Sequence, residues 1–398
     1  MKDYFPGHPK ILFVCLMTST HTHSWLSLLK DMKINVRVYA IDGFMPNYFN
    51  LPTHLLKEDY LSRFANKDFY WNKFGIAIRG SAILFGKDVS FLDNILLPRA
   101  IRAWKPDIVH TLGFEPASYV YLKVREILGP KHKAKWIVTA RGGPELAIKS
   151  KIPEVAEIIA NVFRACDQFI ADNQQNYNLA MNLGLEKHKV CPLGVVPGTG
   201  GIDVDSIISK GYYLPSKKKR IILWPKAYEC PASKALPVFE ALTICWDSIS
   251  PCEIYMTAMT QETMMWFMNM PEHIRKSCHI NERIPRSDLL EIMLRSRVLL
   301  APSITDGIPN VLYEAMASCV FPIVSPIDSL QNIVSEEDNV LFARNLYPNE
   351  ISTALIRAMS DDVLVDTAAK RNVELVKSIA NKNIIAGKVF KNYINLIA

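Results

Sequence analysis

The chain has 398 residues, of which 49% are hydrophobic and 21% are charged, and its formal net charge is +7. This composition is typical of a folded globular protein, and the length exceeds what one core usually holds, so we expect two domains. The sequence lacks a run of 18 uncharged apolar residues, which argues against a transmembrane helix. The short apolar run at residues 11–17 is interpreted as a buried strand and not as a signal peptide.

The positive charge is concentrated in the first half of the chain. Residues 1–200 contain 25 Lys and Arg against 17 Asp and Glu, whereas the remaining residues are almost balanced. A basic half can face anionic lipid, nucleic acid or a phosphorylated substrate, and scattered surface lysines are the plain alternative. Because no arginine-rich or aromatic-interleaved basic run occurs, we expect no nucleic-acid partner. The eight cysteines include no Cys-x-x-Cys pair, so we expect reduced thiols.

Short apolar runs alternate with amphipathic segments along the first half. The predicted strands are 11–16, 36–40, 106–110, 136–139 and 169–171, and the predicted helices are 24–32, 116–128 and 153–166. A less regular stretch at 44–75 and a long amphipathic region up to about Trp104 separate the second and third strands. This alternation predicts parallel β-α-β units and an open doubly wound sheet.

A break at residues 195–201 precedes a second alternating series. Its predicted strands are 220–224, 253–258, 279–284, 298–301 and 321–324, and its predicted helices are 233–247, 261–269 and 287–296. We expect domains at 1–200 and 215–382, with a last helix at 383–398 that packs back on the first domain. Two such halves leave a cleft between them, and ligands of open α/β sheets gather outside the carboxyl ends of the strands.

The stretch from Pro302 to Ala317 carries the strongest functional signal. Asp306 and Glu314 bracket a turn between the strand at 298–301 and the next helix, and Pro309 suits the first helical position. The free amides and positive dipole end of that helix form an anion site. An anion site flanked by two carboxylates fits a nucleotide sugar. The plain alternative for both acids is helix-end electrostatics, worth about 0.3–1 kcal/mol.

The pattern Pro-Ser-x-x-Asp-Gly-x-Pro-x-x-x-x-Glu-Ala-Met-Ala resembles the signature of GT-B glycosyltransferases, specifically the family 4-like retaining enzymes. Element order resembles that family over most of the chain, and the match is specific at about residues 220–345. The resemblance implies an α/β fold with two doubly wound Rossmann-like domains facing across a cleft. It also implies sugar transfer from a nucleotide donor with retained anomeric configuration, and neither a metal nor another cofactor.

The resemblance implies donor-binding roles around the motif. Asp306 would contact the donor sugar or the reacting region, and Glu314 would bind the ribose hydroxyls. The amides of Gly307 and Ile308, with Asn310, would lie near the sugar and the phosphates.

Two further segments complete the expected donor site. Lys226 and Lys234 follow the first strand of the second domain and would bind the diphosphate, although most lysines are merely solvated. Arg283 and Ile284 would read the base, with a plain strand-to-helix turn as the alternative.

Two departures from the family pattern stand out. Asp306 is shorter than the usual Glu, and Cys319 replaces a Gly that would suit a left-handed turn.

The acceptor side is expected in the first half. After the first strand, relatives often have a Gly-rich turn, whereas this chain has hydroxyls and two histidines. Ser19 or His21 would line the active site; we expect no metal there, and N-capping by Ser24 is the alternative. His110, at the end of a strand, is a catalytic candidate, with a satisfied core histidine as the alternative.

The loop after the strand at 136–139 also resembles a family feature. Relatives have a His-Gly-x-Asp pattern here; Arg141 takes the place of the His, and Glu145 would take the place of the Asp. The alternative is that this loop is a plain turn with surface charge. Gly142 and Gly143 permit close approach of the backbone to a ligand. Arg141 is placed among the catalytic candidates because it could neutralise a phosphate or a carboxylated sugar.

Together these features predict a glycosyltransferase that uses a UDP- or GDP-sugar and a glycan or polyprenyl-diphosphate-linked acceptor in cell-surface polysaccharide or lipopolysaccharide biosynthesis. The basic first half would contact an anionic membrane from the cytoplasmic side. A GT-B sugar-nucleotide epimerase and a catalytically silent GT-B binding subunit are the alternatives.

Overall fold

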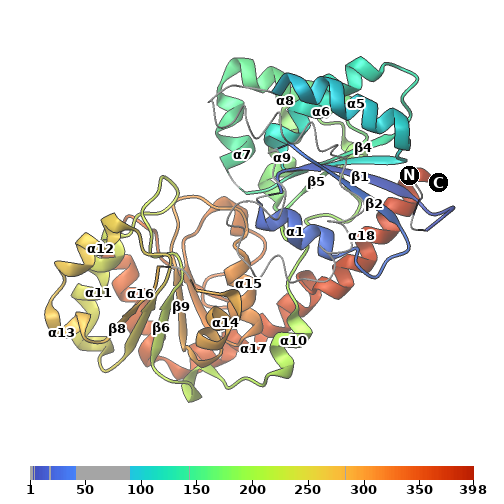
Figure 1. Cartoon of the computed structure of the whole chain (residues 1–398). Coiled ribbons are helices and arrows are strands. Elements are labelled where there is room, and N and C mark those ends of the chain that lie inside the picture. Colours follow the sequence, from blue (N-terminus) through green and yellow to red (C-terminus); the bar gives the residue numbers. More distant parts are fainter. Residues whose placement is uncertain (1–2, 4, 18, 42–89, 143, 283) are drawn as a thin grey trace. The chain divides into compact units, whose positions relative to one another are not determined.

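The computed structural model describes residues 3, 5–17, 19–41, 90–142, 144–282 and 284–398 (Figure 1). The predicted stretch at 44–75, most of the amphipathic region before Trp104, Gly143 and Arg283 lie outside these residues. The chain divides into two compact units. The first domain is Met1–Gly200 with Asn383–Ala398, and the second is Gly201–Lys382.

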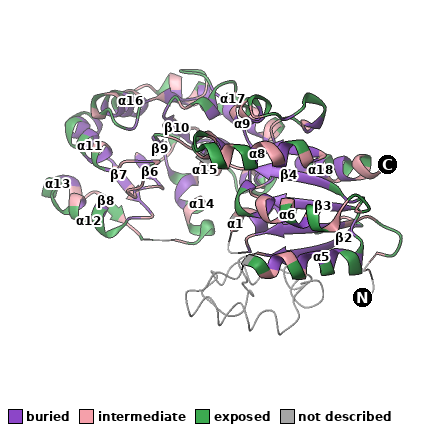
Figure 2. Ribbon diagram, turned by 90° about the horizontal axis from the view of Figure 1, so that it is seen from above, coloured by how far each residue is buried: buried purple, intermediate pink, exposed green. Residues whose placement is uncertain are grey.

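The first domain is built on a parallel sheet with the strand order β2-β1-β3-β4-β5. Its strands are β1 (Lys10–Cys15), β2 (Asn35–Ala40), β3 (Ile108–Leu112), β4 (Lys135–Ala140) and β5 (Gln168–Ala171). Their residues are almost all buried, as expected for a sheet covered on both faces (Figure 2). The strand order reverses between β1 and β3, and the carboxyl ends there form a typical ligand-binding crevice.

The two faces of this sheet contact different helices. Leu12 and Val14 belong to one hydrophobic cluster, whereas Ile11 and Phe13 belong to another, because successive strand residues point to opposite faces. The first cluster contains α5 (Asp93–Trp104), α6 (Tyr119–Leu128), α8 (Pro153–Ala165) and α9 (Gln174–Asn182), and the second contains α1 (Thr20–Ser27) and α18 (Lys382–Ile397). Short helical segments lie at η1 (Ser90–Leu92), η2 (Phe114–Ser118), α7 (Pro144–Ala147), η3 (Lys149–Lys151) and η4 (Lys187–Lys189).

The second domain has a parallel sheet with the strand order β11-β10-β9-β6-β7-β8. Its strands are β6 (Ile221–Trp224), β7 (Glu253–Met256), β8 (Cys278–Ile280), β9 (Val298–Ala301), β10 (Phe321–Val324) and β11 (Leu341–Phe342). The strand order reverses between β6 and β9, so the carboxyl ends of these two neighbours form the crevice of this sheet.

Helices of the second domain pack around this sheet. The longer ones are α11 (Leu236–Ile249), α12 (Gln261–Met268), α14 (Arg286–Arg295), α15 (Asn310–Ala317), α16 (Pro348–Ser360) and α17 (Asp362–Ile379). The shorter ones are α10 (Val204–Ser209), α13 (Glu272–Arg275), η5 (Pro215–Lys217) and η6 (Asp328–Leu330). The predicted α/β class and the doubly wound parallel sheet of each domain are confirmed.

The elements differ from the predictions at several ends. Helix α1 begins at Thr20, so Ser24 lies inside the helix and Ser19 occupies the N-cap position. Strand β8 ends at Ile280, four residues earlier than predicted, because the chain leaves this edge strand before Pro285, which precedes α14. Helices α9, α16 and α17 were not predicted.

A buried polar chain joins helix α18 to the first sheet, and it contains His110, for which the sequence left a catalytic role and a satisfied core histidine open. Both ring nitrogens of this fully buried histidine are engaged: Nδ1 lies 2.8 Å from the Tyr393 hydroxyl, and Nε2 lies 2.6 Å from Thr139 Oγ1. Trp25 Nε1 donates to the same hydroxyl at 3.0 Å. Burial, assisted by the charge of Arg141, holds the pKa of His110 well below its ordinary value, so the ring is neutral. His110 therefore anchors α18 from inside the core.

We predict that Tyr393→Phe lowers the free energy of unfolding by about 1–3 kcal/mol, because it removes the partner of two buried polar groups. Urea unfolding of the full chain measures the change. Tyr347→Phe is the control, since that ring is 47% exposed, and we expect a change below about 0.5 kcal/mol. Equal losses in the two variants would contradict the buried polar chain.

Candidate active site

Two predicted site residues meet at the point where the strand order of the second sheet reverses. Lys226 follows β6 and Asp306 follows β9, and Lys226 Nζ lies 2.5 Å from Asp306 Oδ2. Burial opposes the charged ammonium, but Asp306, with a smaller contribution from Tyr228, raises the pKa of Lys226 above its ordinary value. The ammonium is therefore charged and is aimed at the carboxyl edge of the sheet.

The two loops that carry this ion pair are tied together through their backbones. The amide of Ile304 donates to the carbonyl of Ala232 at 2.8 Å. The buried Asn345 side chain donates to the carbonyls of Pro302 at 3.1 Å and Lys234 at 3.0 Å, and it accepts the amide of Lys234 at 2.9 Å. One amide side chain thus holds both loops in place, as a preorganised site requires.

Lys234 is bound to a carboxylate that the sequence did not single out. Its Nζ lies 2.5 Å from Glu229 Oε1, and this bond raises the pKa of Lys234. The other oxygen of Glu229 accepts the amide of Ala235 at 3.0 Å. Glu229 therefore fixes where the backbone of this loop turns into α11.

The turn before α15 is buried. Helix α15 begins at Asn310, one residue later than predicted, and Pro309 is its N-cap with φ −66° and ψ 128°. The carbonyl of Gly307 accepts the Ser329 hydroxyl at 3.1 Å, and Ile308 is buried. A turn held by these contacts presents the helix N-terminus in a fixed direction, which suits an anion.

Glu314 is buried within α15 and has a cationic partner. Its Oε1 lies 2.5 Å from Arg286 Nη2, at the start of α14, and the Arg286 side chain is 55% exposed. Burial raises the pKa of Glu314, and Arg286 opposes that rise. The sequence missed Arg286, although it lies next to the turn that was expected to read a base. Ile284 in that turn lines a cavity of about 580 Å³ beside β8 and α14.

The acceptor-side candidates follow strands of the first sheet. Ser19 precedes α1 without a side-chain capping bond, and His21 lies in the first turn of α1. Arg141 and Gly142 follow β4, and the Arg141 guanidinium lies 5.9 Å from the Trp25 ring centroid. Glu145 lies in α7, the helix that follows this turn.

Asp172 organises the Arg141 turn, and the sequence did not single it out. Its side chain is buried directly after β5, and it accepts the Gly142 amide at 2.8 Å and Asn173 Nδ2 at 2.8 Å. Burial raises the pKa of Asp172 to about 6, although Gly142 and Arg141 oppose that rise. A Cβ atom on Gly198 would lie 3.2 Å from its Oδ2, so glycine lets this segment approach the carboxylate. The Gly142 donor comes from a segment 30 positions away, and sequence spacing does not reveal such a contact.

Among the residues that the structure describes, no three His, Cys, Asp or Glu side chains gather in a way that could hold a metal ion. Within the same residues, no helix is long and apolar enough to cross a membrane.

Part of the chain matches a known protein family. Residues 271–376, which include α14, β9 and α15, match the family model described as Glycosyl transferases group 1. The chain carries a glycosyl transferases group 1 domain. This match confirms the resemblance drawn from the motif around Asp306 and Glu314.

A curated relative from Campylobacter jejuni is N,N'-diacetylbacillosaminyl-diphospho-undecaprenol alpha-1,3-N-acetylgalactosaminyltransferase. It is 24% identical over 245 residues, and the match spans 59% of this chain and 62% of the relative.

Solved structures show the same fold over nearly the whole chain. A glycosyltransferase from Rickettsia africae has a TM-score of 0.71 at 13% identity, with 98% of this chain and 99% of that chain covered. The Anabaena protein HepE in complex with UDP has a TM-score of 0.69 at 12% identity, with 97% of this chain and 100% of that chain covered. These neighbours confirm the predicted GT-B fold.

Cys319, at the end of α15, adopts the left-handed backbone conformation that glycine favours, with φ +57°. We predict that Cys319→Gly is more stable to urea than Cys319→Ala by about 1 kcal/mol, because only glycine relieves this conformation. Both variants lose the buried sulfur, which packs with Ala369 and Val373. An alanine variant as stable as the glycine variant would contradict this account of the helix end.

Asp172 predicts a pH dependence of stability. Its raised folded-state pKa of about 6 means that the folded protein binds more protons than the unfolded chain between about pH 4 and pH 6. The stability of the wild type relative to Asp172→Asn should therefore fall as pH rises through this window, by about 3 kcal/mol, and then stay level. Urea unfolding at a series of pH values tests this. A relative stability that is independent of pH, or that rises, would contradict the buried carboxyl group.

Proposed function

We propose that this protein transfers a sugar from a nucleotide-sugar donor to a glycan or polyprenyl-diphosphate-linked acceptor, with retention of configuration. The observation that carries the proposal is the cluster at the β6–β9 crevice. A charged lysine, a carboxylate and a fixed helix N-terminus lie there at the carboxyl ends of neighbouring strands. The carboxylate and the helix belong to the segment that matches the glycosyl transferases group 1 model.

The donor diphosphate would bind to the cations of this crevice. Lys226 and Lys234 supply two ammonium groups, and the first amides of α15 add partial positive charge. Each lysine contacts a carboxylate, which holds its ammonium group in place. With two ammonium groups available, the proposed diphosphate site would not need a metal ion. Charge that develops on the leaving diphosphate would be stabilised by these groups.

The nucleoside would bind at Glu314. A buried carboxylate that faces an exposed arginine can accept hydrogen bonds from two ribose hydroxyls once Arg286 moves aside. Asp306 would orient the donor sugar, and Ile284 would lie near the base. The binding of UDP by HepE, which shares the fold, supports a uridine donor, with GDP as the other choice.

The first domain would serve the acceptor. Asp172 holds the turn that contains Arg141 and Gly142. Arg141 would supply a cation to a phosphate of a polyprenyl-diphosphate-linked glycan, and Gly142, which has no side chain, would let that phosphate come close to the backbone. The diphospho-undecaprenol named for the Campylobacter jejuni relative supports this acceptor class. Such acceptors belong to cell-surface polysaccharide or lipopolysaccharide synthesis, with the enzyme at the cytoplasmic face of a membrane and its basic half toward the lipid.

The ribose assignment gives a sharp prediction. Glu314→Gln should weaken UDP binding by about 10- to 100-fold, because it removes charge-assisted hydrogen bonds, while pyrophosphate affinity stays the same. Isothermal titration calorimetry with both ligands measures this. Glu240→Gln, at an exposed position of α11, is the matched control and should bind both as the wild type does. A parallel loss of UDP and pyrophosphate affinity would reject the ribose role.

Product analysis separates the alternative functions. Incubation with UDP- and GDP-sugars and a polyprenyl-diphosphate-linked glycan should yield an extended glycan with an α-linked sugar from an α-linked donor. An altered donor sugar without any acceptor would favour an epimerase. A protein that binds donor but yields neither product would favour a silent binding subunit.

A further inference from the structure

A basic cavity lies at the amino-terminal edge of the first sheet. Its volume is about 780 Å³. The charged side chains that line it are Arg102, Lys105, Asp107, Lys131, Lys133 and Lys135. Five of these six carry positive charge, so the lining has a net charge of +4.

The cavity is separate from the acceptor-side candidates. Lys135 is the first residue of β4, and Arg141 follows the last residue of the same strand. A strand of this length spans about 17 Å, so the cavity and the Arg141 turn lie at opposite edges of the sheet. The function proposed above assigns no individual role to these cations.

Helix dipoles account for only part of this charge. Helices α5 and α6 end at the cavity, and basic side chains near helix C-termini offset the partial negative charge there. Arg102 does so directly, because its guanidinium donates to the carbonyl of Ile127. Two helix ends contribute about one negative charge in total, which leaves the cavity strongly positive.

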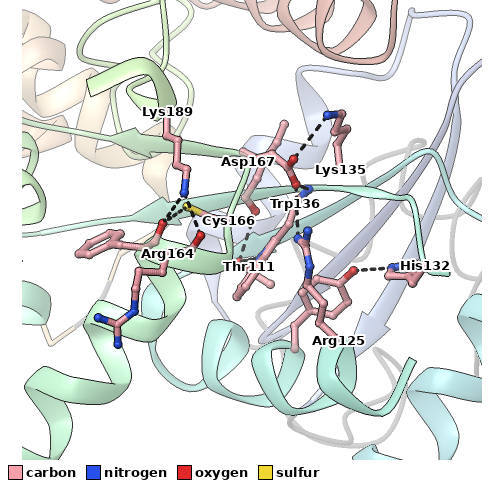
Figure 3. A network of polar contacts seen from close by, with 12 residues as sticks. Thr111, Arg125, His132, Lys135, Trp136, Arg164, Cys166, Asp167 and Lys189 are labelled. Carbon is pink, nitrogen blue, oxygen red and sulfur yellow. Dashed lines mark hydrogen bonds and ion pairs between the residues drawn. The ribbon is translucent and has the colours of Figure 1, made fainter. Parts of the chain in front are cut away.

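Of the four lysines that line the cavity, only Lys135 has a carboxylate partner among the described residues. Figure 3 shows Asp167 between Arg125 and Lys135, with oxygen-to-nitrogen distances of 3.3 and 3.5 Å. Asp107 is occupied by the amide of Lys10, to which its Oδ2 lies at 2.8 Å. Within the described part of the chain, no ion pair joins Lys105, Lys131 or Lys133 to an acid.

The backbone of Lys105 gives a second indication. This residue ends α5 in the left-handed conformation, with φ +53° and ψ +67°, where glycine is the favoured residue. A lysine there costs stability but places an ammonium group in the cavity wall. His132 also lines the cavity, and burial, followed by the charge of Arg125, lowers its pKa, so its ring is neutral. Its Nε2 lies 2.8 Å from the Tyr121 hydroxyl.

We propose that this cavity is a binding site for a diphosphate or a similarly multivalent phosphate group. Three lysines without acidic partners converge on it from two segments, the end of α5 and the loop before β4. A multivalent anion matches this charge better than a neutral or cationic ligand does. The group can come from a soluble diphosphate or from a phospholipid headgroup, which share this chemistry.

Calorimetry with inorganic pyrophosphate tests the site in the full chain. The measurement is made on chains that carry Lys226→Ala/Lys234→Ala, so that the donor site does not contribute, and the chain with these two changes alone serves as the wild type. Pyrophosphate should bind the wild type, and Lys131→Glu/Lys133→Glu should bind it about tenfold more weakly or worse. Lys123→Glu/Lys151→Glu, which changes net charge equally at exposed positions outside the cavity, should bind as the wild type does. Equal affinity in the two double variants, or no binding to the wild type, would overturn the proposal.

Lys105→Gly gives an independent measurement. It should raise the melting temperature, because glycine accepts the left-handed backbone, and weaken pyrophosphate binding by about threefold. A purely structural lysine would leave pyrophosphate binding unchanged. UDP affinity should be that of the wild type in this variant, so a failure of the donor site is recognised separately.

Vesicles distinguish the two sources of the phosphate. Phosphatidylcholine vesicles with and without phosphatidic acid, whose phosphomonoester headgroup carries up to two negative charges, are sedimented with each variant. If the cavity holds a headgroup, only the anionic vesicles bind, the Lys131→Glu/Lys133→Glu variant does not bind them, and pyrophosphate competes. Pyrophosphate binding without vesicle binding supports a soluble diphosphate. Vesicle binding that is unchanged both by Lys131→Glu/Lys133→Glu and by pyrophosphate would contradict a site in this cavity.

Discussion

One electrostatic contact joins the two sides of the crevice in the second domain, the ion pair between Lys226 and Asp306. It joins the loops that follow β6 and β9, the two neighbours at which the strand order of the sheet reverses. A parallel sheet opens a crevice at that point because its two crossover connections leave in opposite directions. The pair places a positive and a negative charge in this crevice, and Asn345 holds the backbones beneath it. The fold therefore places both charges before any ligand binds, as the proposed donor role requires.

Buried polar groups give the first domain a similar internal order. His110, Tyr393 and Trp25 form a chain of hydrogen bonds that fastens the C-terminal helix to the sheet. Asp172 fixes the turn after β4 in a similar way, because it accepts hydrogen bonds from the amide of Gly142 and the side chain of Asn173. A buried carboxyl group or imidazole without such partners would cost several kcal/mol, so these contacts define one arrangement of the surrounding loops.

Sequence patterns predicted the local elements well, because apolar periodicity reflects the burial of each strand. They also identified Lys226 and Asp306 separately, but the contact between them depends on the adjacency of β6 and β9, which are 80 positions apart at these residues. Asp172, Arg286 and Asn345 were missed for the same reason, since each has a partner far away in the sequence. Glu229 was missed although its partners Lys234 and Ala235 lie within six positions of it. The contact of His110 with Tyr393 could not be predicted either, because Tyr393 lies 283 positions later in the chain. Cys319 shows the converse, since its unusual residue type was visible in the sequence and its left-handed backbone is visible in the structure.

The most direct test of the Lys226–Asp306 crevice is a double-mutant cycle on UDP binding, measured by calorimetry with the variants Lys226→Ala, Asp306→Asn and both together. If Lys226 exchanges Asp306 for the diphosphate when UDP binds, Lys226→Ala weakens UDP binding by about tenfold or more. Asp306→Asn strengthens it, because the ammonium loses its competing partner, and this gain disappears when Lys226 is absent. UDP affinity that is unchanged in Lys226→Ala, or an Asp306→Asn effect that persists without Lys226, would contradict the account.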